Sequence, residues 1–153
     1  MEDQPADFTS VKTEDMRNRK IVIINDDKKS LGDLEGILVA SGHDLVVVND
    51  ALLAVDIVAQ KQPDVILVEL KMPRKTGFEL ADELNHEFET ERIPIIAMSV
   101  FFKNEFKFLL NLCGIDSYLR KPLNPRDVIC AIENVTDGYD QSDAQETCLE
   151  RVW

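Results

Sequence analysis

Polar side chains that could do chemistry together follow short apolar runs, each at the point where a strand would end. They comprise two adjacent carboxylates, a third carboxylate farther along, a hydroxyl and a lysine: Asp26, Asp27, Glu69, Ser99 and Lys121. Carboxylate oxygens suit a hard divalent cation, and a lysine beside a hydroxyl can hold anionic oxygens. The carboxyl ends of parallel strands meet at one edge of an open α/β sheet, where such folds bind ligands. The spacing therefore predicts one site built from these residues.

The apolar runs have the composition of strands buried on both faces. Each is short and rich in Val or Ile, and most are apolar at successive positions. The expected strands are 21–24, 45–48, 65–68, 95–98 and 117–119. Between them, apolar residues recur at helical spacing. The expected helices are 30–40, one capped by Asn49 or Asp50 and stopped by Pro63, one beginning at Thr76, about 104–113, and one capped by Asn124 with Pro125 at its first position.

Five successive βα units predict an α/β fold with a doubly wound, five-stranded parallel sheet flanked by five helices. Crossovers of this length between parallel strands need a helix and are right-handed. Ser30 is the expected cap of the first helix because its hydroxyl can accept a backbone N–H. Leu52, Val55 and Ala59 are expected to face the core from the second.

Length and charge limit the function classes. The chain has 153 residues, with 17 basic and 29 acidic side chains and a formal net charge of −12. This balance argues against nucleic acid or an anionic membrane as a direct partner, because phosphate backbones require a basic patch. One domain is expected over residues 20–135, between a polar leader (1–19) and an acidic tail (136–153).

The expected compartment is the cytoplasm. The N-terminus lacks the basic and apolar regions of a signal peptide, and no apolar stretch approaches the roughly 20 residues that span a bilayer. Cys113, Cys130 and Cys148 are odd in number and widely spaced. They are therefore expected to be reduced thiols and not a disulfide framework or a metal site.

In this order, the motifs resemble the receiver domain of two-component response regulators, the CheY-like family with a flavodoxin-like (βα)5 fold and strand order 2-1-3-4-5. The resemblance implies that Asp26 and Asp27 bind Mg²⁺, the one cofactor expected. It implies that Ser99 and Lys121 hold phosphoryl oxygens and that Tyr118 is the aromatic switch residue. The Lys-Pro motif continues into Pro122 through a bond that is usually cis in the family, and the loop with Met72-Pro73 and Gly77 also matches.

Glu69 departs from the family, which ordinarily has an aspartate phosphoacceptor at this position. Glutamate moves the carboxylate outward by about 1.3 Å, and a misplacement of about 1 Å can slow a transfer roughly a hundredfold. The residue is therefore expected to be a poor acceptor. Its reach towards Ser99 and Lys121 suggests instead that Glu69 imitates part of the phosphorylated state.

Three functions are compatible with these motifs. The favoured one is a pseudo-receiver, a non-enzymatic signalling module that acts through protein contacts. The alternative is a working phosphoacceptor receiver that takes a phosphoryl group with Mg²⁺ from a histidine kinase. The third is a flavodoxin-like nucleotide or flavin domain, which is disfavoured because the chain has no GxGxxG or GxxxxGK[ST] loop.

A histidine kinase or a downstream effector is the expected partner, and a homodimer is the alternative. In the family, signalling uses the fourth helix, the fifth strand and the fifth helix, here about 101–134. Phe106, Leu109, Leu110 and Cys113 are expected to be needed for the core. This leaves Phe101, Phe102 and Phe108 as aromatics for a partner surface. The last six residues, 148–153, have apolar side chains at helical spacing that could dock on the domain or on a partner.

Overall fold

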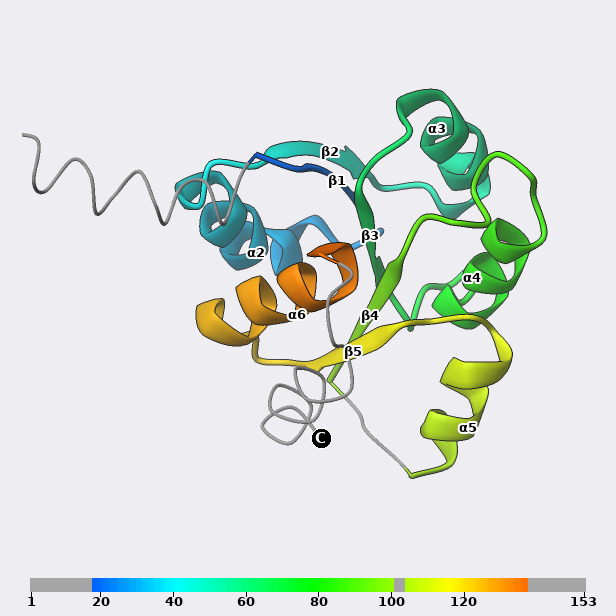
Figure 1. The fold of residues 1–153 in the computed structure, drawn as a ribbon. Coiled ribbons are helices and arrows are strands. Elements are labelled where there is room, and N and C mark those ends of the chain that lie inside the picture. Colours follow the sequence, from blue (N-terminus) through cyan, green and yellow to red (C-terminus); the bar gives the residue numbers. More distant parts are fainter. Residues whose placement is uncertain (1–17, 101–103, 138–153) are drawn as a thin grey trace, which may run out of the picture.

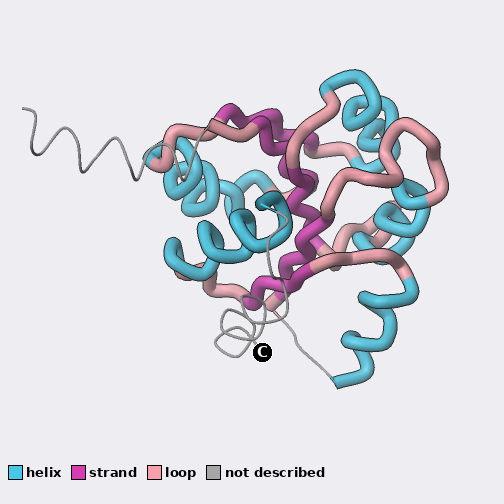
Figure 2. Tube along the Cα trace, in the orientation of Figure 1, coloured by secondary structure: helices cyan, strands magenta, loops and turns pink. Residues whose placement is uncertain are grey.

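The computed structural model describes residues 18–100 and 104–137. Within these ranges the chain alternates strands with helices (Figures 1 and 2). The elements are β1 (Lys20–Ile24), α2 (Lys28–Ala40), β2 (Asp44–Val48), a 3₁₀ turn η1 (Ala51–Leu53), α3 (Ala54–Lys61), β3 (Val65–Glu69), α4 (Gly77–Asn85), β4 (Ile95–Ser99), α5 (Asn104–Leu112), β5 (Ser117–Arg120) and α6 (Pro125–Asp137). All five expected strands are present, each within a residue of its expected bounds.

The strands form one parallel sheet in the order β2-β1-β3-β4-β5. Helices α2 and α6 pack together on one face, while α3, α4 and α5 follow one another across the other (Figure 1). The expected doubly wound, flavodoxin-like architecture is therefore confirmed. None of the helices in the described part of the chain has the length and apolar character needed to span a bilayer.

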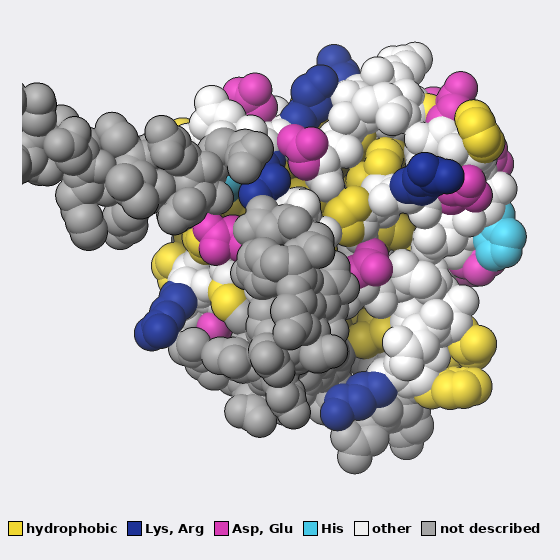
Figure 3. Space-filling view, in the orientation of Figure 1, with side chains coloured by type: hydrophobic (Ala, Val, Ile, Leu, Met, Phe, Trp, Pro, Cys, Tyr) yellow, Lys and Arg dark blue, Asp and Glu magenta, His cyan; other side chains and the backbone are white. Residues whose placement is uncertain are grey.

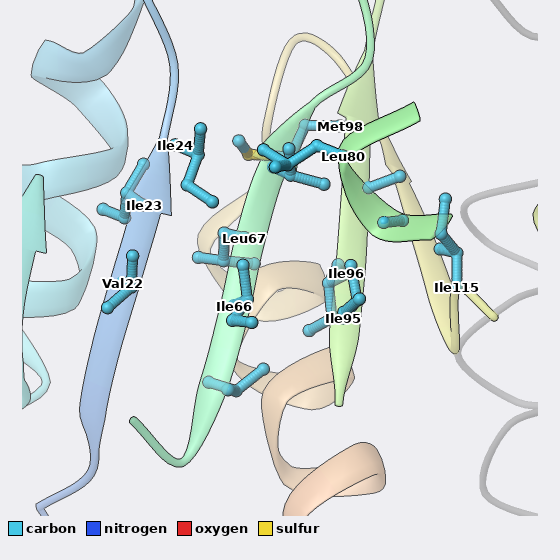
Figure 4. Close-up of a cluster of buried hydrophobic side chains, with 14 of the residues drawn as sticks. Val22, Ile23, Ile24, Ile66, Leu67, Leu80, Ile95, Ile96, Met98 and Ile115 are labelled. Carbon is cyan, nitrogen blue, oxygen red and sulfur yellow. The ribbon is translucent and has the colours of Figure 1, made fainter. Parts of the chain in front are cut away.

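The core is built on the three central strands. Every residue of β3 and β4 is buried, and so are the last four residues of β1. Their side chains meet those of the flanking helices and loops, including Leu80 and Ile115 (Figure 4). Strand β2 at one edge is half-exposed, as its position predicts. The continuous apolar runs in the sequence thus correspond to strands covered on both faces.

Helix starts follow local capping chemistry, with one correction. Asp27, and not Ser30, caps α2: its carboxylate accepts the N–H of Lys29 at 3.1 Å, so the cap lies three residues earlier than expected. Thr76, expected as the start of the next helix, is the N-cap of α4 and forms a reciprocal capping box with Glu79. Both caps fix the direction in which a helix leaves the carboxyl edge of the sheet.

Two expected core positions are exposed. Leu52 is 54% exposed because residues 51–53 form a 3₁₀ turn, which shifts the helical phase so that Ala54 and Val58 face the core. Leu109 is 38% exposed, whereas Leu110 beside it is buried. The short helix α5 therefore covers the sheet with a narrower apolar stripe than its composition suggests.

Candidate functional site

The strand ends bring the predicted site residues to one edge of the sheet. Strand register pairs Glu69 with Met98 and places Ser99 beside Arg120, one residue before Lys121. The Lys121 N–H donates to the Ser99 carbonyl at 2.8 Å, so the chain stays attached to the neighbouring strand as it leaves β5. The peptide bond between Lys121 and Pro122 is cis.

Glu69 and Lys121 form an ion pair at the centre of this edge. The Lys121 ammonium donates to Oε1 of Glu69, and the two side chains are only 16% and 10% exposed. The other carboxylate oxygen, Oε2, accepts the backbone N–H of Lys71 at 3.3 Å. A carboxylate this far from solvent needs such partners, because an unpaired buried charge is strongly destabilising.

Ser99 and Tyr118 lie next to this pair and are buried, Tyr118 completely. Burial raises the pKa of the Tyr118 phenol above its ordinary value, and the Glu69 charge raises it further. A hydrogen bond with Ser99 and the charge of Arg120 act in the opposite direction on the pKa. The phenol is thus turned inward, with its oxygen at the Ser99 hydroxyl and within the field of Glu69.

The acidic pair after β1 is arranged differently. Asp27 is exposed and uses a carboxylate oxygen to cap α2, while Asn25 is buried and its side-chain carbonyl accepts the Asp27 N–H at 2.9 Å. The role of Asn25 in this turn was not predicted from the sequence. An Asn two positions before a helix cap is the available signal, since this side chain commonly closes such a turn.

Asp26 borders an open hollow on the outer side of the edge. The hollow has a volume of about 340 Å³ and is lined by Asp26, Asn49, Asp50, Ala51, Met72, Pro73 and Arg74. The Arg74 guanidinium lies 3.7 Å from the Asp50 carboxylate. The hollow is therefore flanked by carboxylates and a guanidinium, with apolar side chains between them.

Gly77 allows the loop after β3 to fold back on the strand. A Cβ at this position would lie 2.6 Å from the Glu69 carbonyl oxygen and 2.8 Å from the Leu70 Cα. The Gly77 N–H also donates to the Leu70 carbonyl at 2.8 Å. This close approach holds the start of α4 against the backbone of Glu69.

These carboxylates do not form a ready divalent-cation site. Among residues 18–100 and 104–137, no three His, Cys, Asp or Glu side chains are grouped so that they could hold a metal ion. One oxygen of Asp27 is occupied by the α2 cap, and one oxygen of Glu69 by Lys121. The donor set therefore does not fit Mg²⁺ as arranged, and we assign no step to a metal.

The expected partner surface is described only in part. Phe108 is 66% exposed on α5, whereas Phe101 and Phe102 lie outside the described residues. Leu109 and Leu112 on the same helix are exposed as well, and sequence reasoning missed them. Figure 3 shows the exposed apolar side chains and the scattered acidic and basic ones on one face of the molecule.

The cysteines differ from one another. Cys113 has a free thiol whose pKa is raised by burial and by the nearby Asp82 charge. Cys130 takes part in a disulfide bond. The expectation that every cysteine is a reduced thiol is therefore wrong for Cys130.

The sheet order and the polar residues at its carboxyl edge define a receiver-type α/β domain. The family model of the response regulator receiver domain matches residues 21–133, and the chain belongs to this family. It is thus a receiver domain of two-component signalling, a class of signalling modules.

Solved structures agree on the fold. The receiver domain of the sensor histidine kinase PA1611 from Pseudomonas aeruginosa PAO1, which has a magnesium ion coordinated in its active-site cleft, is 21% identical; the match covers 79% of this chain and 99% of that one, with a TM-score of 0.73. A Francisella response regulator 1452 receiver domain is 26% identical over 78% and 98% of the two chains, with a TM-score of 0.71. A response regulator from Desulfuromonas acetoxidans is 24% identical over 77% and 96%, with a TM-score of 0.70.

Proposed function

We propose that this receiver signals through protein contacts without phosphorylation of residue 69, and that Glu69 stands in part for the phosphorylated aspartate. The observation that carries the proposal is the Glu69–Lys121 ion pair. By the family resemblance, Lys121 holds phosphoryl oxygens. Here its ammonium is already bonded to a carboxylate that belongs to the chain.

The reach of Glu69 supports this proposal. The extra methylene carries the carboxylate outward from β3 by about 1.3 Å, towards the lysine and away from the aspartate position. A phosphoryl group needs an acceptor oxygen in line with the donor, and an ångström of displacement can cost about a hundredfold in rate. Glu69 is thus better suited to occupy the phosphoryl space than to accept a phosphoryl group.

The neighbouring switch residues are arranged consistently with an occupied site. The Tyr118 ring is completely buried and its phenol meets Ser99. The imitation is incomplete in charge, because a carboxylate carries −1 whereas a phosphoryl group carries about −1.5 to −2. We therefore expect a weaker bias towards the active arrangement than phosphorylation gives.

The proposed partner is a histidine kinase or a downstream effector of two-component signalling. The exposed Phe108 is the best-described anchor for it, since aromatic side chains near the centre of an interface often carry much of the binding energy. A homodimer through the same helix is the alternative. We place the protein in the cytoplasm and propose that it binds neither nucleic acid nor membrane, in agreement with its charge of −12.

The test is the intact mass of the protein after incubation with Mg²⁺ and a small-molecule phosphodonor. The natural protein and Glu69→Asp are compared, with Glu69→Gln as the control that cannot accept at this position. We expect no phosphoryl adduct on the natural protein. An adduct on Glu69→Asp alone would show that the glutamate at position 69 is what prevents phosphorylation of the natural protein.

A phosphoryl adduct on Glu69 of the natural protein would overturn the proposal in favour of a working phosphoacceptor. The mimicry is tested separately by partner affinity and by the near-ultraviolet signal of Tyr118. Glu69→Gln should change both, because it removes the charge that pairs with Lys121. If both stay unchanged, Glu69 does not bias the switch.

A further inference from the structure

An apolar hollow lies along one side of α6 and includes none of the carboxyl-edge site residues. It has a volume of about 390 Å³ and is lined by Pro125, Arg126, Ile129, Cys130 and Glu133. These residues recur at helical spacing and share one side of the helix. The sheet-facing side of α6 is occupied instead by Val128, Ala131 and Ile132, which are buried. Ile129 is half-buried and also packs against the core, so the hollow is a partly exposed surface at the edge of the core.

One residue that lines this hollow, Cys130, is disulfide-bonded, whereas Cys113 has a free thiol. The chain contains three cysteines. Within one chain, Cys148 is therefore the remaining partner for Cys130.

We propose that the C-terminal segment 148–153 docks in the α6 hollow and is held there by a disulfide between Cys148 and Cys130. The segment carries Leu149, Val152 and Trp153 at positions i, i+3 and i+4, so a helical turn would present them together. Apolar side chains of this spacing suit a hollow whose lining includes Ile129 and Pro125.

Charge and chain length are compatible with this occupant. Arg126 and Glu133 at the ends of the hollow can meet Glu150 and Arg151 of the segment. Helix α6 ends at Asp137, about 10 Å beyond Cys130 along the helix axis at 1.5 Å per residue. Residues 138–147 can span up to about 33 Å when extended, which is ample for the return to Cys130.

Bond formation is a two-electron oxidation. The two thiols lose two protons and two electrons, and a low-molecular-weight disulfide such as oxidised glutathione accepts them and becomes two thiols. The reaction proceeds by thiolate attack through a mixed disulfide, and an excess of reduced thiol reverses it. Docking therefore depends on the redox state, and so does the access of other molecules to this side of α6.

The covalent part is tested by alkylation with N-ethylmaleimide and intact mass. After treatment with oxidised glutathione, we expect one adduct, on Cys113, and a proteolytic fragment that joins Cys130 to Cys148. After reduction, unfolding and alkylation, we expect three adducts. Cys113→Ser is the matched control and should keep the bond. A bond to Cys113, a lasting glutathione adduct on Cys130 or Cys148, a linked dimer or three adducts after oxidation would each overturn the proposal.

The docking is tested through Trp153, the single tryptophan of the chain. Acrylamide should quench its fluorescence several-fold less in the oxidised than in the reduced protein. Ile129→Asp should keep the disulfide but restore quenching, whereas Val39→Asp on the exposed side of α2 should not. Trp153→Ala, which changes no residue of the family-matched range 21–133, should make the bond several-fold easier to reduce with glutathione. Equal quenching in both redox states, or no effect of Trp153→Ala, would show a tether without a docking site.

Discussion

The two halves of the carboxyl edge differ in burial and in how their charges are satisfied. On the β3–β5 side, Glu69 and Lys121 are paired out of solvent beside a buried phenol. On the β1 side, Asp27 is exposed and caps a helix, and Asp26 borders an open hollow. We call the β3–β5 side the closed half and the β1 side the open half. In the closed half, the charges of Glu69 and Lys121 depend on each other because water cannot replace a lost partner. Charges in the open half are solvated and can be changed separately.

The largest expected effect comes from breaking the closed pair. Lys121→Met keeps much of the side-chain length but leaves the Glu69 carboxylate buried without its cation. The free energy of unfolding should fall by about 3 kcal/mol or more. Urea denaturation, followed by far-ultraviolet circular dichroism, measures the loss.

The controls separate charge from packing. Adding Glu69→Gln to Lys121→Met should recover most of the lost stability, because no buried charge then remains. Asp26→Asn in the open half should change stability by less than about 0.5 kcal/mol. If Asp26→Asn is as damaging as Lys121→Met, the contrast between the halves is wrong.

The next effect concerns the loop that fixes Glu69. Gly77→Ala introduces a Cβ 2.6 Å from the Glu69 carbonyl oxygen, and backbone atoms cannot move aside cheaply. Stability should fall by about 1–3 kcal/mol. Gly36→Ala at an exposed position of α2 is the matched control, since nothing lies within 4 Å of the Cβ that it would add. It should raise stability by up to about 1 kcal/mol through helix propensity. The opposite order in thermal unfolding would contradict the packing argument.

A smaller effect tests what Asp27 does in the open half. Asp27→Ala removes the acceptor for the Lys29 N–H and should cost about 1 kcal/mol. Asp27→Asn keeps a capping oxygen and should leave stability nearly unchanged in urea denaturation. Equal losses in the two variants would mean that the charge of Asp27, and not its cap, is what the fold uses.

The sequence predicted the parts of this molecule that are local or periodic. The buried strands follow from continuous Val and Ile runs, and the helix start near Thr76 follows from the helical spacing of apolar residues. The meeting of Glu69 with Lys121 follows from the order of the strand ends. Three-dimensional context decided the rest. The 3₁₀ turn before α3 exposed Leu52, and the Asn25 turn gave the α2 cap to Asp27 in place of Ser30. The 3₁₀ turn and the change of cap both depend on how the backbone turns before the helix. The spacing of apolar residues along the helix does not record that turn, so periodicity alone could not reveal either shift.

The smallest expected effect is a change in the pKa of Tyr118, the buried aromatic residue beside Glu69 and Lys121. The folded-state pKa of Tyr118 is raised above its ordinary value of 10.0 by burial and, in part, by the Glu69 charge. Above pH 10, the unfolded chain loses its Tyr118 proton before the folded protein does. The free energy of unfolding should therefore fall as the pH rises through this range.

Absorbance titration of the tyrosinate near 295 nm measures this pKa directly, with Tyr139→Phe used as the background to isolate Tyr118. Glu69→Gln should lower the pKa of Tyr118, because it removes a negative charge that opposes ionisation. Asp26→Asn should leave it almost unchanged, since the open half is solvated and screened. A larger response to Asp26 than to Glu69 would show that the two halves share one electrostatic environment.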